Sequence, residues 1–107
     1  MEEFQKQINN LEGSIKVTLY EASNGHNYGE EYLRELFKQN KKLCAKMFKS
    51  IAIFKQMGRS TPEKYSKHLE DGIYELRAGV GNDESKVLYF FVIGNEILIT
   101  NGFTKKT

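Results

Sequence analysis

The sequence contains one cysteine, one proline and no tryptophan among its 107 residues. With a single cysteine, Cys44, the chain cannot form an internal disulfide, so its fold must depend on packing. No stretch approaches the roughly 20 apolar residues of a membrane span, and the N-terminal MEEFQKQINN is charged where a signal peptide is apolar. We therefore expect a cytoplasmic protein that does not associate with membranes.

Motifs for the common catalytic and cofactor sites are also missing. The two histidines, His26 and His68, are far apart, and neither stands at a zinc-site spacing from a cysteine or an acidic residue. The chain has no P-loop, no GxGxxG and no GxSxG. These absences argue against a metal centre, nucleotide hydrolysis and serine-type acyl transfer, and we expect no cofactor.

Charge is distributed unevenly along the chain, although the net charge is only +2. Residues 1–33 carry −4, residues 34–67 carry +8, residues 68–84 carry −4 and residues 85–107 carry +2. A positive field on one part of a nearly neutral molecule favours a polyanionic partner. A solvated lysine-rich helix face gives the same pattern, so charge alone leaves both interpretations open.

Hydrophobic periodicity predicts helices in the first half of the chain. The spacing of Phe4, Ile8 and Leu11 indicates a short helix in an N-terminal extension, residues 1–13. Two further helices are expected on either side of Asn40, and Cys44 lies on the apolar stripe of the second, where we expect it in the core. The opposite face of that helix carries Lys41, Lys42, Lys46, Lys49 and Lys55.

Four segments have the composition of strands. The first alternates apolar and polar side chains, and the other three are rich in aliphatic and aromatic residues. The third is nearly all apolar, as a central strand would be. The four segments are residues 14–22, 73–78, 86–92 and 96–100.

The connections between these segments define the expected topology. Residues 58–67 are typical of a loop, residues 79–83 of a longer flexible loop, and Gly94-Asn95 of a two-residue hairpin. The last three strands then form an antiparallel meander with the helical hairpin packed on one face. The sequence predicts a single α+β domain, residues 1–107, whose other sheet face is open to solvent or a ligand.

The candidate functional residues are cations on or beside this sheet. Arg77 is expected on the sheet face that points away from the helices. Lys86 begins the next strand, near enough to Arg77 for both side chains to meet one phosphate. Lys105 and Lys106 follow the last strand, so we expect the four cations to gather at one end of the sheet.

Five short strings provide a more specific indication. They are MGR at 57–59, KHLEDG at 67–72, GIYELR at 72–77, VLYFF at 87–91 and GFTKKT at 102–107. In this order they resemble the HigB branch of the RelE superfamily, toxins of bacterial type II toxin–antitoxin pairs that are often carried on phages. The resemblance covers roughly residues 15–107.

This resemblance implies a RelE-like fold and a metal-independent endoribonuclease that cuts messenger RNA in the ribosomal A site. It also implies a helix-turn-helix antitoxin as partner, besides the ribosome and its messenger RNA. Translation would be inhibited as a result.

Position by position, the resemblance implies that Arg77, Lys86, Lys105 and Lys106 form the catalytic set. The 2′-hydroxyl attacks the adjacent phosphorus, and the phosphorane needs positive charge near its oxygens. Arg77 is expected to stabilise the phosphorane, and Lys86 to act as base or acid. The residues expected to contact RNA are Lys41, Lys42, Lys46, Lys49, Lys67 and His68.

Two departures from the family pattern bear on activity. Lys86 stands where relatives commonly have arginine, so a bidentate phosphate clamp becomes a point charge. Relatives usually continue with a basic tail beyond the position of Thr107, so weak cleavage is expected of this form.

A non-catalytic RNA-binding or regulatory module of the same fold is the main alternative function, and a phage interaction protein without RNA affinity is a third.

Overall fold

A computed structural model describes residues 3–106, and the elements below are those of this range. Met1, Glu2 and Thr107 lie outside the described residues. The start of the predicted 1–13 extension and the last residue of GFTKKT are therefore not described. The elements are α1 (Glu3–Asn9), β1 (Lys16–Leu19), α2 (Tyr28–Gln39), α3 (Lys41–Met57), the 3-10 helix η1 (Gly58–Ser60), β2 (Ser66–Glu70), β3 (Ile73–Val80), β4 (Asp83–Phe91) and β5 (Glu96–Lys106).

The five strands form one mixed sheet in the order β1-β5-β4-β3-β2. Strands β2 to β5 are an antiparallel meander, whereas β1 lies parallel to β5. The predicted α+β class is confirmed, and the architecture is compatible with a RelE-like fold. The predicted antiparallel meander is likewise confirmed. The sequence indicated the strand β1 but not its pairing, which is with β5.

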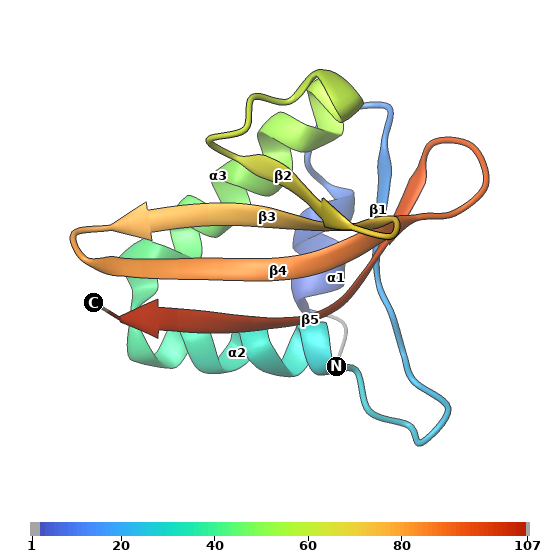
Figure 1. The fold of residues 1–107 in the computed structure, drawn as a ribbon. Helices are drawn as coiled ribbons and strands as arrows, with labels where there is room; N and C mark the ends of the chain where they lie inside the picture. Colours follow the sequence, from blue (N-terminus) through green and yellow to red (C-terminus); the bar gives the residue numbers. More distant parts are fainter. Residues whose placement is uncertain (1–2, 107) are drawn as a thin grey trace.

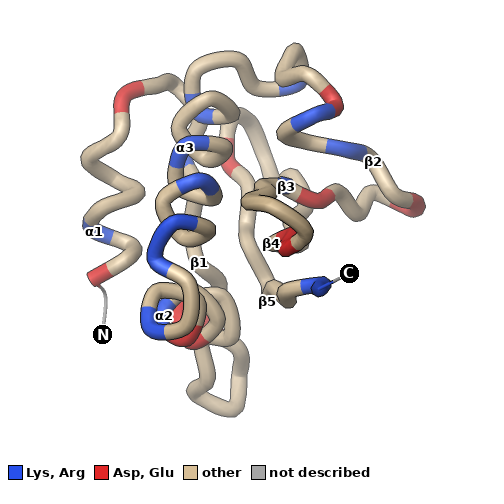
Figure 2. The backbone as a smooth tube through the Cα atoms, turned by 90° about the vertical axis from the view of Figure 1, so that its left-hand side faces the viewer, with Lys and Arg blue, Asp and Glu red and all other residues tan. Residues whose placement is uncertain are grey.

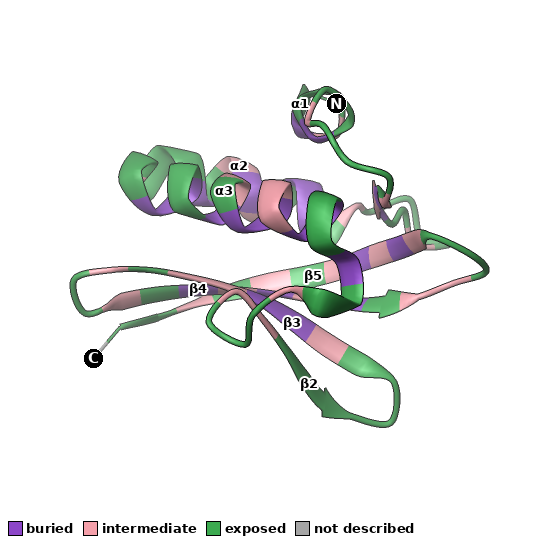
Figure 3. Cartoon of the chain, turned by 90° about the horizontal axis from the view of Figure 1, so that it is seen from above, coloured by how far each residue is buried: buried purple, intermediate pink, exposed green. Residues whose placement is uncertain are grey.

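Helices α1, α2 and α3 lie on one side of the sheet (Figure 3). Helix α2 runs along β5 and α3 passes behind β3 (Figure 1). Their apolar stripes meet the inner faces of the strands, so the predicted hairpin on one sheet face is confirmed. Fully buried aliphatic side chains come from both layers, among them Leu33, Leu43, Met47, Ile51, Leu76, Val87, Ile97 and Ile99.

Helix α1 covers the helical hairpin from outside. The ring of Phe4 lies 5.7 Å from that of Phe48, and Ile8 is fully buried. The helix ends at Asn9 and not near Gly13 as the spacing of apolar residues predicted. After Asn9 the chain turns back toward α3, because Ile15 N–H donates to the carbonyl of Lys55.

The predicted break at Asn40 is confirmed. Its backbone N–H donates to the carbonyl of Leu36 at the end of α2, and its side-chain oxygen accepts from Leu43 N at the start of α3 (3.1 Å). One residue thus ends one helix and caps the next. This fixes the short connection of the hairpin.

Lys55 does not belong to the solvated lysine face predicted for α3. Its side chain is buried, and its ammonium donates to the carbonyl of Ile8 (2.8 Å). Burial lowers the pKa of Lys55. The interaction ties α1 to α3, so this lysine has a structural role.

Three predicted connections are wrong in detail. Residues 58–67 contain η1 and the start of β2, an edge strand whose exposed side chains show no alternation. Residues 79–83 make a tight turn, because Val80 pairs directly with Asp83. The last hairpin has four connecting residues, 92–95, and β5 continues to Lys106.

A bulge in the β4–β5 ladder determines which side chains of β5 face the helices. Tyr89 pairs with Ile99 and Leu88 with Asn101, so Thr100 is the extra residue. After the bulge, Gly102 and Thr104 therefore face the helices, whereas Phe103 and Lys105 face away from them.

The hydroxyl of Tyr32 holds α2 to this inner face. Its Oη lies 2.6 Å from Ser85 Oγ and 2.8 Å from Thr104 Oγ1, and it donates to the carbonyl of Phe103 (3.0 Å). The ring passes over Gly102, where an added Cβ would lie 2.5 Å from the ring and 2.9 Å from the carbonyl oxygen of Lys86.

We predict that Gly102→Ala lowers the free energy of unfolding by about 1–3 kcal/mol, because the methyl group displaces the Tyr32 ring. Gly79→Ala is the matched control, since its Cβ would meet only Asp83 O at 3.6 Å. That variant should be neutral or up to about 1 kcal/mol more stable. Urea unfolding measures both, and equal effects would contradict the packing described.

Cys44 is buried in the core as predicted, with Sγ 3.9 Å from the carbonyl oxygen of Leu33. Burial raises the pKa of the Cys44 thiol from 9.0 to about 11. Above pH 9 the unfolded chain therefore releases this proton while the folded chain keeps it. Stability should fall as pH rises through this window.

We predict that the wild type loses about 1–2 kcal/mol more stability than Cys44→Ala between about pH 8 and about pH 10.5. The comparison is needed because Tyr89, whose pKa burial raises to about 12, contributes equally in both proteins. Urea unfolding at a series of pH values gives the two slopes. Parallel curves would show that Cys44 does not titrate as described.

Candidate functional site

A cationic groove lies where β3 continues beyond its pairing with β2. It has a volume of about 460 Å³ and is bounded by α3, by the segment before β2 and by β3 and β4. Of its lining residues within 3–106, five are cations and one, Glu84, is an acid. The cations are Lys46, Lys49, Lys64, Arg77 and Lys86; we call this site the cationic groove.

Arg77 and Lys86 are direct partners in the β3–β4 ladder. Their side chains leave the same face of the sheet, the one that points away from the helices, with Cβ atoms about 4.5–5.5 Å apart. Both retain some exposure, 31% for Arg77 and 19% for Lys86. The structure thus brings together the two residues that the sequence proposed for one phosphate.

A buried carboxylate holds the two cations in place. Glu75 Oε2 lies 3.2 Å from Arg77 Nε and 3.8 Å from Lys86 Nζ, while Arg77 also donates to the carbonyl of Glu63 (3.1 Å). The Glu75 side chain is only 5% exposed. Sequence reasoning missed this role, although Glu75 stands two residues before Arg77 and therefore on the same strand face.

A second carboxylate approaches Lys86 from solvent. Glu84 Oε1 lies 3.9 Å from Lys86 Nζ, and the Glu84 side chain is 49% exposed. It lies in the same strand as Lys86, two residues away. The groove therefore combines several cations with one accessible carboxylate.

Lys105 and Lys106 are not a pair beyond the last strand, as predicted, but its final residues. Lys105 pairs with Glu84 and Lys106 with Asp83. Consecutive strand residues point to opposite faces, so Lys105 shares the face of Lys86 and Lys106 points to the helical side. The four predicted cations therefore do not all converge.

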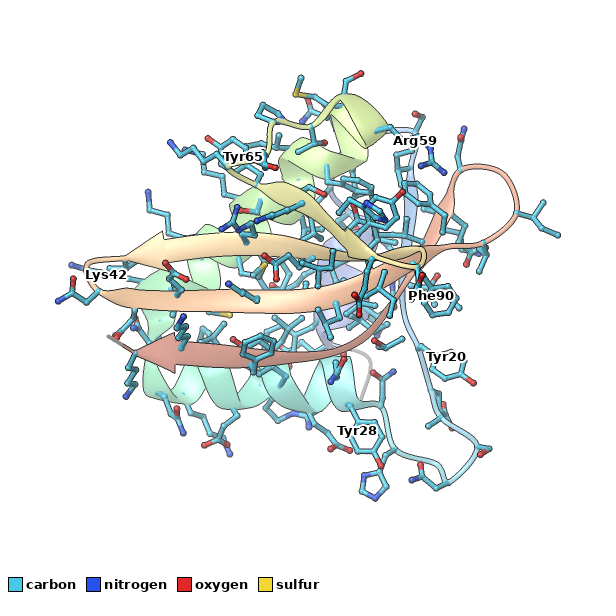
Figure 4. The ribbon with its side chains drawn as sticks, in the orientation of Figure 1. Tyr20, Tyr28, Lys42, Arg59, Tyr65 and Phe90 are labelled. Carbon is cyan, nitrogen blue, oxygen red and sulfur yellow. The ribbon has the colours of Figure 1, made fainter. Side chains whose placement is uncertain are left out.

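The predicted RNA contacts are also divided. Lys46 and Lys49 line the cationic groove. Lys41 and Lys42 instead lie at the start of α3 (Figure 4), where the Lys41 ammonium is 5.3 Å from the centre of the Phe37 ring.

The two candidates in β2 face different ways. Lys67 pairs with Glu75 on the outer sheet face, and the His68 ring lies 4.7 Å from that of Tyr74 toward the helical side. Lys67 and His68 therefore do not share one face of the sheet.

Lys64 and Tyr65 complete the groove and were not predicted. The carbonyl of Tyr65 accepts from Arg77 N–H (2.8 Å), which extends the β2–β3 pairing by one bond. Tyr65 lies beside the sheet edge formed by β3 (Figure 4). Both residues belong to a segment that the sequence predicted only as a loop. The feature that could have identified them is the neighbouring pair of a cation and an aromatic residue, Lys64 and Tyr65.

The positive charges of residues 34–67 lie on α2, along α3 and on the segment that leads into β2 (Figure 2). A groove with this excess of cations attracts the phosphates of a nucleic acid backbone. Within residues 3–106 no group of three or more His, Cys, Asp or Glu side chains is arranged to hold a metal ion. In the same range no helix has the length and apolarity needed to cross a membrane.

Residues 34–107 match the family described as "Phage derived protein Gp49-like (DUF891)". The matched region contains every residue of the cationic groove. Among curated proteins, no match is found.

We predict that Glu75→Gln lowers the free energy of unfolding by about 1–3 kcal/mol, because the neutral amide no longer compensates two partly buried cations. Glu84→Gln removes the same charge from an exposed site and should change stability by less than about 0.5 kcal/mol. Urea unfolding at neutral pH compares them. If both variants match the wild type, Glu75 does not organise the pair.

Proposed function

The chain belongs to the Gp49-like family of phage-derived proteins, which is associated with RelE- and HigB-like toxins, and we propose that it is the toxin of a type II toxin–antitoxin pair. In this proposal it acts in the cytoplasm as an endoribonuclease on ribosome-bound messenger RNA and inhibits translation. A helix-turn-helix antitoxin is its regulatory partner.

One observation carries the proposal: Arg77 and Lys86 lie side by side on an open sheet face at the edge of a groove lined by further cations. Such a groove suits a polyanionic strand, and its two central cations are ordered by Glu75 before any ligand binds. Charge that is already positioned stabilises a transition state at little reorganisation cost.

In the proposed reaction, the 2′-hydroxyl of the bound RNA attacks the adjacent phosphorus, and the bond to the 5′-oxygen of the next nucleotide breaks. Arg77 offers planar donors to the phosphorane oxygens. The products are a 2′,3′-cyclic phosphate and a free 5′-hydroxyl. No redox step is involved.

The proton transfers follow from the neighbours of Lys86. Glu75 and Glu84 both lie within 4 Å of its Nζ, and we assign to Lys86 the role of protonating the leaving 5′-oxygen. Glu84, the exposed acid of the groove, accepts the proton of the 2′-hydroxyl. Of the two roles that the sequence left open for Lys86, the proposal therefore adopts that of the acid.

The remaining cations bind RNA in this proposal. Lys46 and Lys49 from α3, and Lys64 from the segment before β2, hold the phosphates of the substrate strand. Lys41, Lys42, Lys67, His68 and Lys105, which lie outside it, contact ribosomal or messenger RNA.

The test is induced expression in bacterial cells, with growth and cuts in ribosome-bound messenger RNA as readouts. Replacing Arg77 and Lys86 alone would leave Glu75 buried without its cations, so the test variant is R77Q/K86Q/E75Q, compared with E75Q. We expect the triple variant to relieve growth arrest and to lower cleavage by at least about a hundredfold.

The matched control is K6A/K38A, which removes two exposed cations of α1 and α2 and should remain toxic. Undiminished arrest with the folded triple variant would refute the site. Salt-sensitive RNA binding by the wild type, without cut products, would instead support the non-catalytic RNA-binding module.

A further inference from the structure

The structure points to a second feature on the outer sheet face: we propose that Phe103 forms a stacking subsite for one unpaired nucleobase. The inference rests on the proposed function and adds to it the position and orientation of the substrate strand. The phosphate lies at Arg77 and Lys86, and the base attached to it turns toward β5.

The β4–β5 register places this subsite. Phe103 pairs directly with Lys86, and Lys86 pairs with Arg77 on its other side. The three side chains therefore form a row across β5, β4 and β3 on the face away from the helices. Lys105, two residues after Phe103, lies on the same face, so cations flank the ring on two sides.

The ring of Phe103 does not pack into the core of the fold. It is 45% exposed and is not among the partly buried hydrophobic residues packed against the core. Among the described residues, its ring makes no aromatic pair, whereas Phe4, Phe54 and Phe91 each make at least two. Its face is thus available for a ligand.

An exposed aromatic ring between cations is the arrangement by which proteins bind single-stranded nucleic acids. The cations contact the backbone, and the ring stacks on a base with little dependence on base identity. Paired bases of a duplex do not offer an open face for this contact. The ligand class is therefore single-stranded nucleic acid with at least one unstacked base.

Phe90 provides a matched comparison within the same strand pair. It lies on the same outer face and is 36% exposed, but it pairs with Leu98 and not with a cation. Figure 4 shows it toward the end of β4 that leads to the last hairpin. Exposure of an aromatic ring alone would make Phe90 and Phe103 equivalent, whereas the proposal distinguishes them.

The absence of tryptophan from the chain allows a direct test. Phe103→Trp and Phe90→Trp each introduce a single fluorescent indole. The probes are an oligothymidylate of about six nucleotides and an abasic oligodeoxyribose phosphate of equal length, neither of which has a 2′-hydroxyl to be cleaved.

We expect the oligothymidylate to quench Phe103→Trp and the abasic probe to leave its emission unchanged. Phe90→Trp should respond to neither. Equal responses of the two indoles, or equal effects of the two probes on Phe103→Trp, would overturn the proposal.

Affinity measurements at low salt give a second, independent readout. Phe103→Leu, which keeps an apolar side chain, should weaken oligothymidylate binding by about five- to a hundredfold without changing abasic binding. Phe103→Tyr should restore it, and Phe90→Leu should have no effect. Unchanged binding by Phe103→Leu would refute stacking.

The same measurements separate this inference from the proposed function. If R77Q/K86Q/E75Q binds both probes as the wild type does while Phe103→Leu weakens only the oligothymidylate, the phosphate site fails and the stacking subsite stands. If the triple variant loses both probes while Phe103→Leu binds normally, the stacking subsite alone fails.

Discussion

A buried carboxylate between two cations is the interaction on which the candidate site depends. Glu75 has lost nearly all contact with solvent, so its charge requires Arg77 and Lys86 close by, and they in turn are held on the open face of the sheet. The arrangement is anchored by strand pairing and not by a loop, because all three residues belong to β3 and β4. The centre of the groove is therefore held by strand pairing, and lysines of α3 and of the segment before β2 line its margin.

Much of the fold could be predicted from local pattern. The α2–α3 hairpin, its break at Asn40 and the strands β3 to β5 have regular apolar spacing or a clear capping residue, and their existence was anticipated. The edge strand β2 was missed because nearly all its side chains are exposed, so no period-two pattern exists to find. The length of β5 was underestimated because polar residues after Thr100 look like a tail when their pairing with β4 is unknown.

The site was predictable in part for the same reason. Strand alternation correctly placed Arg77 outward, and Lys86 lies beside it as expected, although β4 begins at Asp83 and not at Lys86. Alternation alone does not show that Glu75 is buried, because outward-facing side chains are usually solvated and here the long cations cover it. The separation of Lys105 from Lys106 follows only from knowing that both lie within β5.

The acidic first third of the chain and the basic remainder form one structure. The family match begins at residue 34, yet Phe4, Ile8, Val17 and Leu19 from before that point are buried in the common core. Strand β1 covers the first part of the β5 edge, and α1 covers the hairpin. The groove residues thus lie in the matched region, while part of the packing that supports them comes from outside it.

The bulge at Thr100 divides β5 into two parts whose inward-facing side chains differ in kind. Before it, the inward residues are Ile97 and Ile99, which fill the core; after it, they are Gly102 and Thr104, which receive the Tyr32 side chain. In an unbulged strand the alternation would place Phe103 and Lys105 beneath the helices, where neither a charge nor so large a ring has room. One inserted residue therefore shifts the alternation of side chains by one position. The first half of the strand packs into the core, and the second half presents an aromatic and a cationic side chain to solvent.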